Sequence, residues 1–271
     1  MIRTIKQLVA CSSLLLGLAI GSLTAHAGTP CEDVINSPET TQKSLSIGQK
    51  VFKALDSTGT KVALVARVGQ DLSKYGLRFS HMGFVVKNHP DGPWSVVHML
   101  NQCGTDRSDI YIQGLGNFFA DGMVAYEAAI LTLPAETQDR LEKFLTGSRV
   151  KRFFEPKYSV VAYPFAIKYQ NSNQWALETL ASALAQEGDI SNRSEAQQWL
   201  KDAGYEPSVL NIGTMTRLGG RMFKANVAFD DHPDELRWND KITVVSVESA
   251  YSFIRKKYPL DTKRIIVDLL D

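Results

Sequence analysis

The sequence predicts an α+β fold in which an antiparallel sheet is flanked by helices. Short β-branched apolar runs predict strands, at 61–68, 81–87, 94–100 and 128–133. Turn-forming residues fill 88–93, so the second and third runs form a β-hairpin. Apolar residues at helical spacing in 44–56, and again after Ser172, predict helices that pack against this sheet.

The remaining elements follow from local signals. Pro134 opens a helix that continues to about Leu145, as proline in a first helical turn often does. The central helix begins near Ser172, because asparagine and serine are preferred N-caps. We expect an extended segment at 160–169 and a long ordered excursion at 205–239. We also expect helices at 194–203 and 249–257 and a strand at 243–247.

The N-terminus is typical of a cleavable secretory signal peptide, residues 1–27. Arg3 and Lys6 precede an apolar run from Leu8 to about Leu23, and the run ends at Ala25-His26-Ala27. A membrane anchor is the first alternative, but the run is short for a span and contains serine and glycine. A lipoprotein is the second, but the apolar run follows Cys11 instead of preceding it. We therefore expect a periplasmic or secreted protein, with a polar N-terminal arm at 28–43 and a single domain at 44–271.

Composition limits the classes of partner. The net charge is +1 with 22% charged residues, and no basic stripe interleaves with aromatic residues, so neither nucleic acid nor anionic lipid is expected as a partner. No second apolar run reaches membrane length, so no stable membrane anchor is expected beyond the signal. A cell-envelope peptide, glycan or lipid remains as a partner class. Cys31 and Cys103 form one disulfide if they meet after export.

Three residues form a candidate catalytic set. His81 and His98 lie on the paired strands of the hairpin and touch if the register puts them on one face. Ser172 opens a helix, where backbone N–H groups stabilise an anion. With Ser172 as nucleophile, His81 as base and His98 orienting His81, the set has the logic of a hydrolase or acyl transferase. The amide side chains of Asn171, Asn173 and Gln174, with Trp175, are candidate substrate-binding residues.

The segment Ser80-His81-Met82-Gly83-Phe84-Val85-Val86 resembles the Ser-His-x-Gly strand of NlpC-type papain-like peptidases. In their circularly permuted branch, which includes lecithin:retinol acyltransferase-like proteins, the histidine strand comes first and the nucleophilic cysteine last. Ser172, within Asn171-Ser172-Asn173, stands at the place of that cysteine. The resemblance implies a permuted papain-like fold.

A closer resemblance, over nearly the whole chain after the signal, is to the bacterial domain-of-unknown-function family 2145. The segments that carry it include Val97-His98-Met99-Leu100-Asn101-Gln102-Cys103-Gly104, Gly114-Leu115-Gly116-Asn117-Phe118-Phe119, Tyr169-Gln170-Asn171-Ser172-Asn173-Gln174-Trp175 and Phe229-Asp230-Asp231-His232-Pro233. This resemblance implies no activity, and it implies that serine is the ordinary residue at Ser172.

Two other functions stay open from the sequence. A non-catalytic envelope-binding module would hold a peptide or glycan on Trp175, Phe118 and Phe119, with Ser172 only capping a helix. A metal protein would use His81, His98 and His232, although the spacing around Asp230-Asp231-His232 favours a proline-ended turn. Arg67, Asp71 and Asp106 are polar residues near the hairpin that could rim the same cleft. The leading hypothesis needs no metal and no cofactor.

Overall fold

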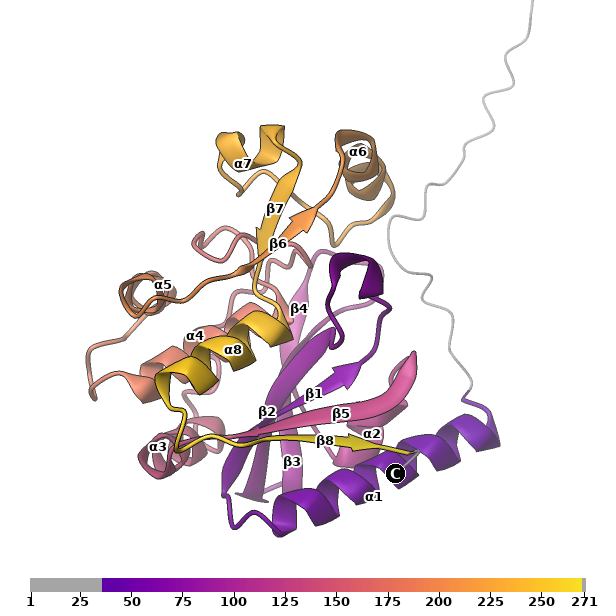
Figure 1. Cartoon of the computed structure of the whole chain (residues 1–271), viewed down its shortest axis with the longest axis vertical. Coiled ribbons are helices and arrows are strands. Elements are labelled where there is room, and N and C mark those ends of the chain that lie inside the picture. The colour runs from indigo at the N-terminus through magenta and orange to yellow at the C-terminus, as the bar shows by residue number, and fades with distance from the viewer. Residues whose placement is uncertain (1–35, 270–271) are drawn as a thin grey trace, which may run out of the picture.

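The computed structural model describes residues 36–269 (Figure 1). The predicted signal peptide, Cys31 and the first half of the predicted arm, residues 28–35, lie outside these residues. In chain order the elements are α1 (Pro38–Asp56), β1 (Val62–Val68), a 3₁₀ turn η1 (Ser73–Tyr75), β2 (His81–His89), β3 (Gly92–Asn101), β4 (Ser108–Gln113), α2 (Leu115–Ala120), β5 (Ala125–Thr132), α3 (Ala135–Leu145), α4 (Ser172–Leu184), α5 (Arg193–Asp202), β6 (Ser208–Asn211), α6 (Thr214–Phe223), α7 (Asp234–Trp238), β7 (Lys241–Val244), α8 (Val247–Lys257) and β8 (Arg264–Asp268).

Six strands form one sheet in the order β4-β3-β2-β1-β5-β8, and every neighbouring pair is antiparallel. β1 is central and all of its residues are buried, which explains its continuous apolar sequence. β4 and β8 are edge strands and are only partly buried. The predicted α+β class with an antiparallel sheet flanked by helices is confirmed.

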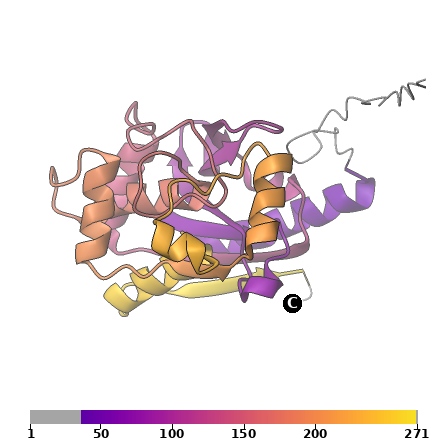
Figure 2. The same ribbon diagram turned by 90° about the horizontal axis from the view of Figure 1, so that it is seen from above.

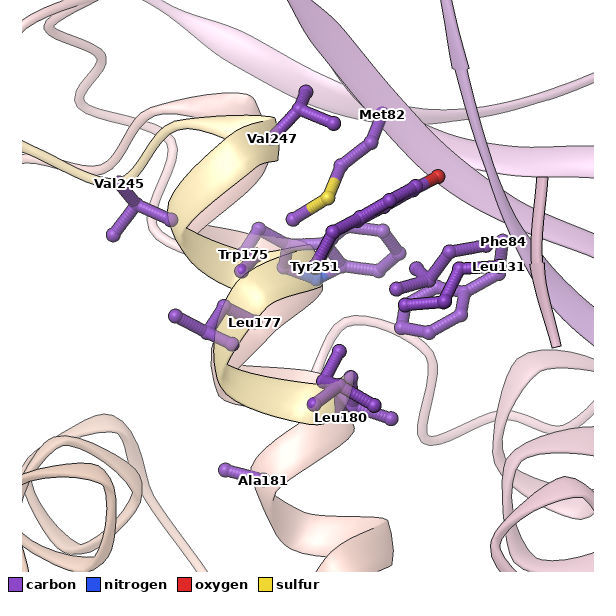
Figure 3. Close-up of a cluster of buried hydrophobic side chains, with 14 of the residues drawn as sticks. Met82, Phe84, Leu131, Trp175, Leu177, Leu180, Ala181, Val245, Val247 and Tyr251 are labelled. Carbon is purple, nitrogen blue, oxygen red and sulfur yellow. The ribbon is translucent and has the colours of Figure 1, made fainter. Parts of the chain in front are cut away.

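Helices cover both faces of this sheet (Figures 1 and 2). On one face α1 and α2 enclose the alternate strand residues Ala63, Val65 and Val85. On the other, α3, α4 and α8 pack on Leu64, Phe84 and their neighbours. Figure 3 shows this second core, where Trp175 of α4 lies between β2 and α8. The ring of Trp175 meets that of Phe84 edge to face at a centroid distance of 5.9 Å.

A smaller lobe stands at one end of the molecule (Figure 1). It consists of the two-stranded β6–β7 sheet with α6 and α7, and it occupies most of the excursion predicted at 205–239. Its small apolar core includes Leu210, Phe229 and Ile242, and Val161 from the main body joins it. The lobe is therefore attached to the main domain by shared packing.

The hairpin of β2 and β3 and the start of the central helix at Ser172 are confirmed. The first helix, however, starts at Pro38, inside the predicted arm, because Ser37 caps it by accepting from Thr40 N and Pro38 occupies the first turn. Residues 160–169 form turns and not the predicted extended segment. The sequence reading missed β4, α2 and β8. No helix among residues 36–269 has the length and apolarity needed to cross a bilayer.

Candidate functional site

The site lies where β2 and β3 separate. β2 stays paired with β1 as far as His81, whereas its pairing with β3 ends at Phe84 and Val97, after which β3 continues against β4. The side chain of Asn173, in the first turn of α4, fills the gap. Its Oδ1 accepts from the backbone N–H of Met82 at 3.0 Å, and its Nδ2 donates to the carbonyl of Ser80 at 3.3 Å. The start of α4 is thereby fixed to the strand on both sides of His81.

Three side chains form a hydrogen-bonded chain at this point. Nε2 of His81 lies 2.8 Å from Nδ1 of His98, and Nε2 of His98 lies 3.1 Å from Oε1 of Gln113 in β4. Because the amide oxygen of Gln113 can only accept, His98 carries its proton on Nε2 and accepts from His81 through Nδ1. His81 is then protonated on Nε2, which leaves a lone pair on its Nδ1. The predicted contact between the two histidines is confirmed.

Gly83 makes the close approach of these strands possible. A Cβ at this position would lie 2.8 Å from Cβ of His98, 3.0 Å from the carbonyl oxygen of Val97 and 3.0 Å from Cγ1 of Val96. No larger residue fits without moving β3 and His98. The glycine of the Ser-His-x-Gly segment therefore has a packing reason. The serine has a local one, because Oγ of Ser80 accepts from the N–H groups of Gly69 and Gln70.

Arg67 lies beside the histidine pair. It is the cross-strand neighbour of His81 on β1, and only 4% of its surface is exposed. Its guanidinium donates to the carbonyl of Phe118 at 2.6 Å and pairs with Asp121 at 2.5 Å. The ring of Phe118, in α2, contacts both imidazoles, at centroid distances of 5.8 Å and 5.2 Å. Phe118 of the short helix α2 thus contacts the two histidines through its ring and Arg67 through its carbonyl.

Burial and Arg67 keep both imidazoles neutral. Desolvation first, then the positive charge of Arg67 and the neighbouring His98, hold the pKa of His81 well below its usual value. The same two main causes lower the pKa of His98 to about 3, against the hydrogen bond with Gln113. At neutral pH the chain of rings is therefore uncharged, and Arg67 supplies the local positive charge.

Ser172 is the first residue of α4. Asn171 is the N-cap, and its Oδ1 accepts from the N–H of Gln174 at 2.7 Å. Burial raises the pKa of the Tyr158 phenol, and a hydrogen bond with Ser172 opposes that shift. Within residues 36–269, no hydrogen bond joins the Ser172 hydroxyl to His81, whose Nε2 is directed at His98.

Ser172 and His81 open onto the same cavity, which has a volume of about 980 Å³. They reach it from different sides of the sheet. Strand alternation places His81 with His98 and Arg67 on the face that α2 covers, whereas α4 covers the opposite face. Residues from both faces nevertheless line this one cavity, which lies beyond the end of the β2–β3 pairing. Most of the other polar residues that line the cavity are uncharged: Asn36, Gln70, Ser80, Asn101, Gln113, Asn117, Tyr158, Asn171, Asn173 and Asn226.

The other predicted site residues are divided between the cavity and the core. Asn171 and Asn173 line the cavity, but the side chain of Asn173 is committed to β2. Gln174 is buried, donates to the carbonyls of Tyr163 and Pro164, and lies outside the lining. Trp175 and Phe118 are fully buried, and so is Phe119. These three rings therefore offer no surface for stacking a ligand.

The segment Asp230-Asp231-His232 is separate from this cavity. Nδ1 of His232 lies 3.0 Å from Oδ1 of Asp231, and its Nε2 lies 2.9 Å from the carbonyl of Thr243, so the ring fixes a turn to β7. Asp230 bonds to Lys168 and Tyr169. Among residues 36–269, no group of three or more His, Cys, Asp or Glu side chains is placed to hold a metal ion. A metal site built from His81, His98 and His232 is not supported.

Sequence reasoning missed Gln113, Tyr158 and the position of α2. It also did not separate Arg67, which lines the cavity, from Asp71 and Asp106, which do not. The available signal was the alternation of apolar and polar residues in 108–113, which are followed by Gly114 as the N-cap of α2. The pairing of Cys103 with Cys31 stays a prediction, because Cys31 lies outside the described residues.

One comparison with known proteins gives a match. A family model described as "Uncharacterized protein conserved in bacteria (DUF2145)" covers residues 54–254, which include Arg67, His81, His98, Gln113 and Ser172. No curated protein matches the chain. No solved structure matches it.

Proposed function

Because the chain belongs to the DUF2145 family, whose description assigns no activity, we propose its function from the site: hydrolysis or acyl transfer at an amide or ester bond. The observation that carries the proposal is the chain His81–His98–Gln113, which ends in the cavity that also contains the start of α4 and Ser172. We further propose a permuted papain-like arrangement. Its support is the chain order of the histidine strand, the second histidine and the helix start.

Ser172 is the nucleophile in this proposal. Its Oγ forms a bond to the substrate carbonyl carbon. Because Ser172 and His81 reach the cavity from different faces of the sheet, the hydroxyl proton passes to Nδ1 of His81 through one water molecule in the cavity. The oxyanion that develops is held by backbone N–H groups at the start of α4 and by the amide of Asn171. His81 then returns the proton to the leaving amine or alcohol, and an acyl-serine forms. Water or an acceptor alcohol or amine completes the cycle by attacking the acyl-serine.

His98 and Gln113 are positioning residues. Their hydrogen bonds fix the tautomer in which Nδ1 of His81 carries the lone pair. Arg67 disfavours the imidazolium form of His81. An oxyanion adds negative charge beside these groups and offsets that effect, so His81 becomes a stronger base as the transition state forms.

A cysteine at position 172 tests whether His81 is coupled to the nucleophile. We expect the thiol of Ser172→Cys to react with iodoacetamide faster at pH 7 than the thiol of Ser194→Cys. Ser194 is a control for the helix start, because it also lies in the first turn of a helix, α5. It is exposed whereas Ser172 is buried, so accessibility alone would make the control thiol the faster one. A second substitution, His81→Ala, should remove most of the difference in reaction rate. The part that remains would come from the helix terminus and Arg67, which also stabilise a thiolate. The wild-type protein gives the background from native cysteines.

The proposal fails if the pH–rate profile of Ser172→Cys is the same with and without His81. Circular dichroism of each variant separates loss of coupling from loss of fold.

Export is part of the proposed role. Removal of residues 1–27 would leave Gly28 as the first residue of the mature protein, in the periplasm or outside the cell. N-terminal sequencing of the protein recovered from the envelope fraction tests this, and an intact Met1 would contradict it.

A non-catalytic binding site is the second candidate, and the lining of the cavity favours it. Most of the polar residues that line the cavity are amides, which suit a peptide or glycan. In that case soluble cell-wall fragments raise the melting temperature of the wild type and of Ser172→Ala equally. Turnover of the same fragments by the wild type alone would favour the enzyme.

A further inference from the structure

Helix α6 presents its apolar side to solvent. Met215, Leu218 and Met222 follow the i, i+3, i+7 spacing of one helical face. Their exposed fractions are 79%, 51% and 59%. Three large apolar side chains in one stripe are more than isolated surface residues, because they form a continuous patch.

The opposite side of α6 is polar and buried. Arg217 is 7% exposed; it donates to the carbonyl of Arg237 and lies 3.0 Å from Oδ1 of Asp240. Gly220 faces Val227 on the same side, with the Cβ position 3.4 Å from Cγ1 of Val227. A surface helix ordinarily buries its apolar stripe. In α6 this arrangement is reversed: its polar side is buried, and its apolar side has no packing partner among the described residues.

Trp238 is a separate exposed apolar residue of the same lobe. Its side chain is 72% exposed, and the neighbouring carbonyl of Arg237 accepts from Arg217, which lies on the buried polar side of α6. α6 and α7 both lie at the end of the molecule beyond the main sheet (Figure 1). The exposed apolar stripe of α6 therefore lies at this end, where an extended apolar phase such as a bilayer interface can meet it.

The charge on α6 selects the kind of surface. From Thr214 to its C-cap Lys224, the helix contains three cations, Arg217, Arg221 and Lys224, and no carboxylate. Arg221 and Lys224 are exposed, and within residues 36–269 neither is in an ion pair. An amphipathic helix with large apolar side chains and flanking cations binds at the interface of an anionic membrane.

We propose that α6 forms a docking surface for an anionic lipid bilayer, with Met215, Leu218 and Met222 entering the headgroup region and Arg221 and Lys224 contacting lipid phosphates. The binding is peripheral. It does not depend on a catalytic role of Ser172. Asn226, two residues beyond the C-cap of α6, lines the cavity, so docking brings this wall of the cavity close to the membrane surface.

Vesicle sedimentation tests the proposal with the full-length mature protein. We expect it to sediment with phosphatidylglycerol vesicles and at least tenfold less with phosphatidylcholine vesicles. The triple variant Met215→Ser, Leu218→Ser, Met222→Ser should lose at least tenfold in the partition coefficient. Because these side chains are exposed, its far-ultraviolet circular dichroism should match the wild type.

A matched control removes three exposed apolar residues elsewhere, in Val124→Ser, Ile167→Ser, Leu260→Ser. It should sediment like the wild type. The variant Arg221→Glu, Lys224→Glu should lose binding to anionic vesicles in particular. Equal sedimentation of the triple α6 variant and the wild type, or no sedimentation of the wild type, overturns the proposal. A concentration-dependent dimer that the α6 variant abolishes would assign the patch to a second copy of this chain, and that result also overturns it.

Discussion

The variant Gly83→Ala tests the geometry that joins the two histidines. The added methyl would lie 2.8 Å from Cβ of His98 and 3.0 Å from Cγ1 of Val96, which is closer than ordinary van der Waals contact. Both neighbours belong to a buried strand that cannot simply rotate away. Overpacking of this kind costs about 1–3 kcal/mol of unfolding free energy. At roughly 2–4 °C per kcal/mol for a domain of this size, the melting temperature should fall by several degrees.

Gly219→Ala is the matched control. A Cβ there meets nothing within 4 Å, and the residue lies inside α6. Alanine in an exposed helix interior stabilises by up to about 1 kcal/mol relative to glycine. Urea unfolding followed by circular dichroism measures both variants. The reasoning is refuted if Gly83→Ala is as stable as Gly219→Ala, because β3 would then approach β2 less closely than the structure has it.

Three further predictions use the same unfolding assay. Asn173→Ala should lose about 1–3 kcal/mol, since a buried N–H of β2 loses its acceptor; a smaller loss than that of an exposed-site alanine variant would contradict the role of this side chain. Because the pKa of His98 falls to about 3 and that of His81 is also lowered, the unfolded chain binds more protons than the native one below about pH 6.5. Stability should therefore be greatest above pH 6.5 and decline toward pH 3, by at most about 1.4 kcal/mol per pH unit for each histidine, and a flat profile would contradict it. Arg193→Met should cost about 3–5 kcal/mol, because it strands the buried carboxylate of Glu178, and the additional substitution Glu178→Gln should recover part of that loss.

The sequence predicted the interior of the fold better than its edges. β1, β2 and β3 are buried, so their apolar runs are strong signals, and the turn formers between β2 and β3 specify the hairpin. β4 and β8 are edge strands with mixed polar and apolar residues, and short α2 has no polar cap. These elements are specified by their neighbours more than by their own sequence.

The same limit applies to the site. The contact of His81 with His98 follows from the hairpin, and the position of Ser172 follows from its capping signals. Strand alternation fixes the face of the sheet on which His81 lies. Which helix covers that face could not be predicted, because the sequence did not predict α2. Gln113 belongs to the missed edge strand. Trp175 stands in an amide-rich segment, but its position on α4 turns it into the core against Phe84.

Labelling with a fluorophosphonate tests the central claim most directly. The reagent forms a covalent bond to a serine oxygen that a neighbouring base activates, and mass spectrometry of peptides identifies the labelled residue. The account predicts a single adduct on Ser172 in the wild type, none in Ser172→Ala, and a strongly reduced yield in His81→Ala with its fold intact. An unlabelled wild type, or equal labelling of Ser172 with and without His81, would contradict it.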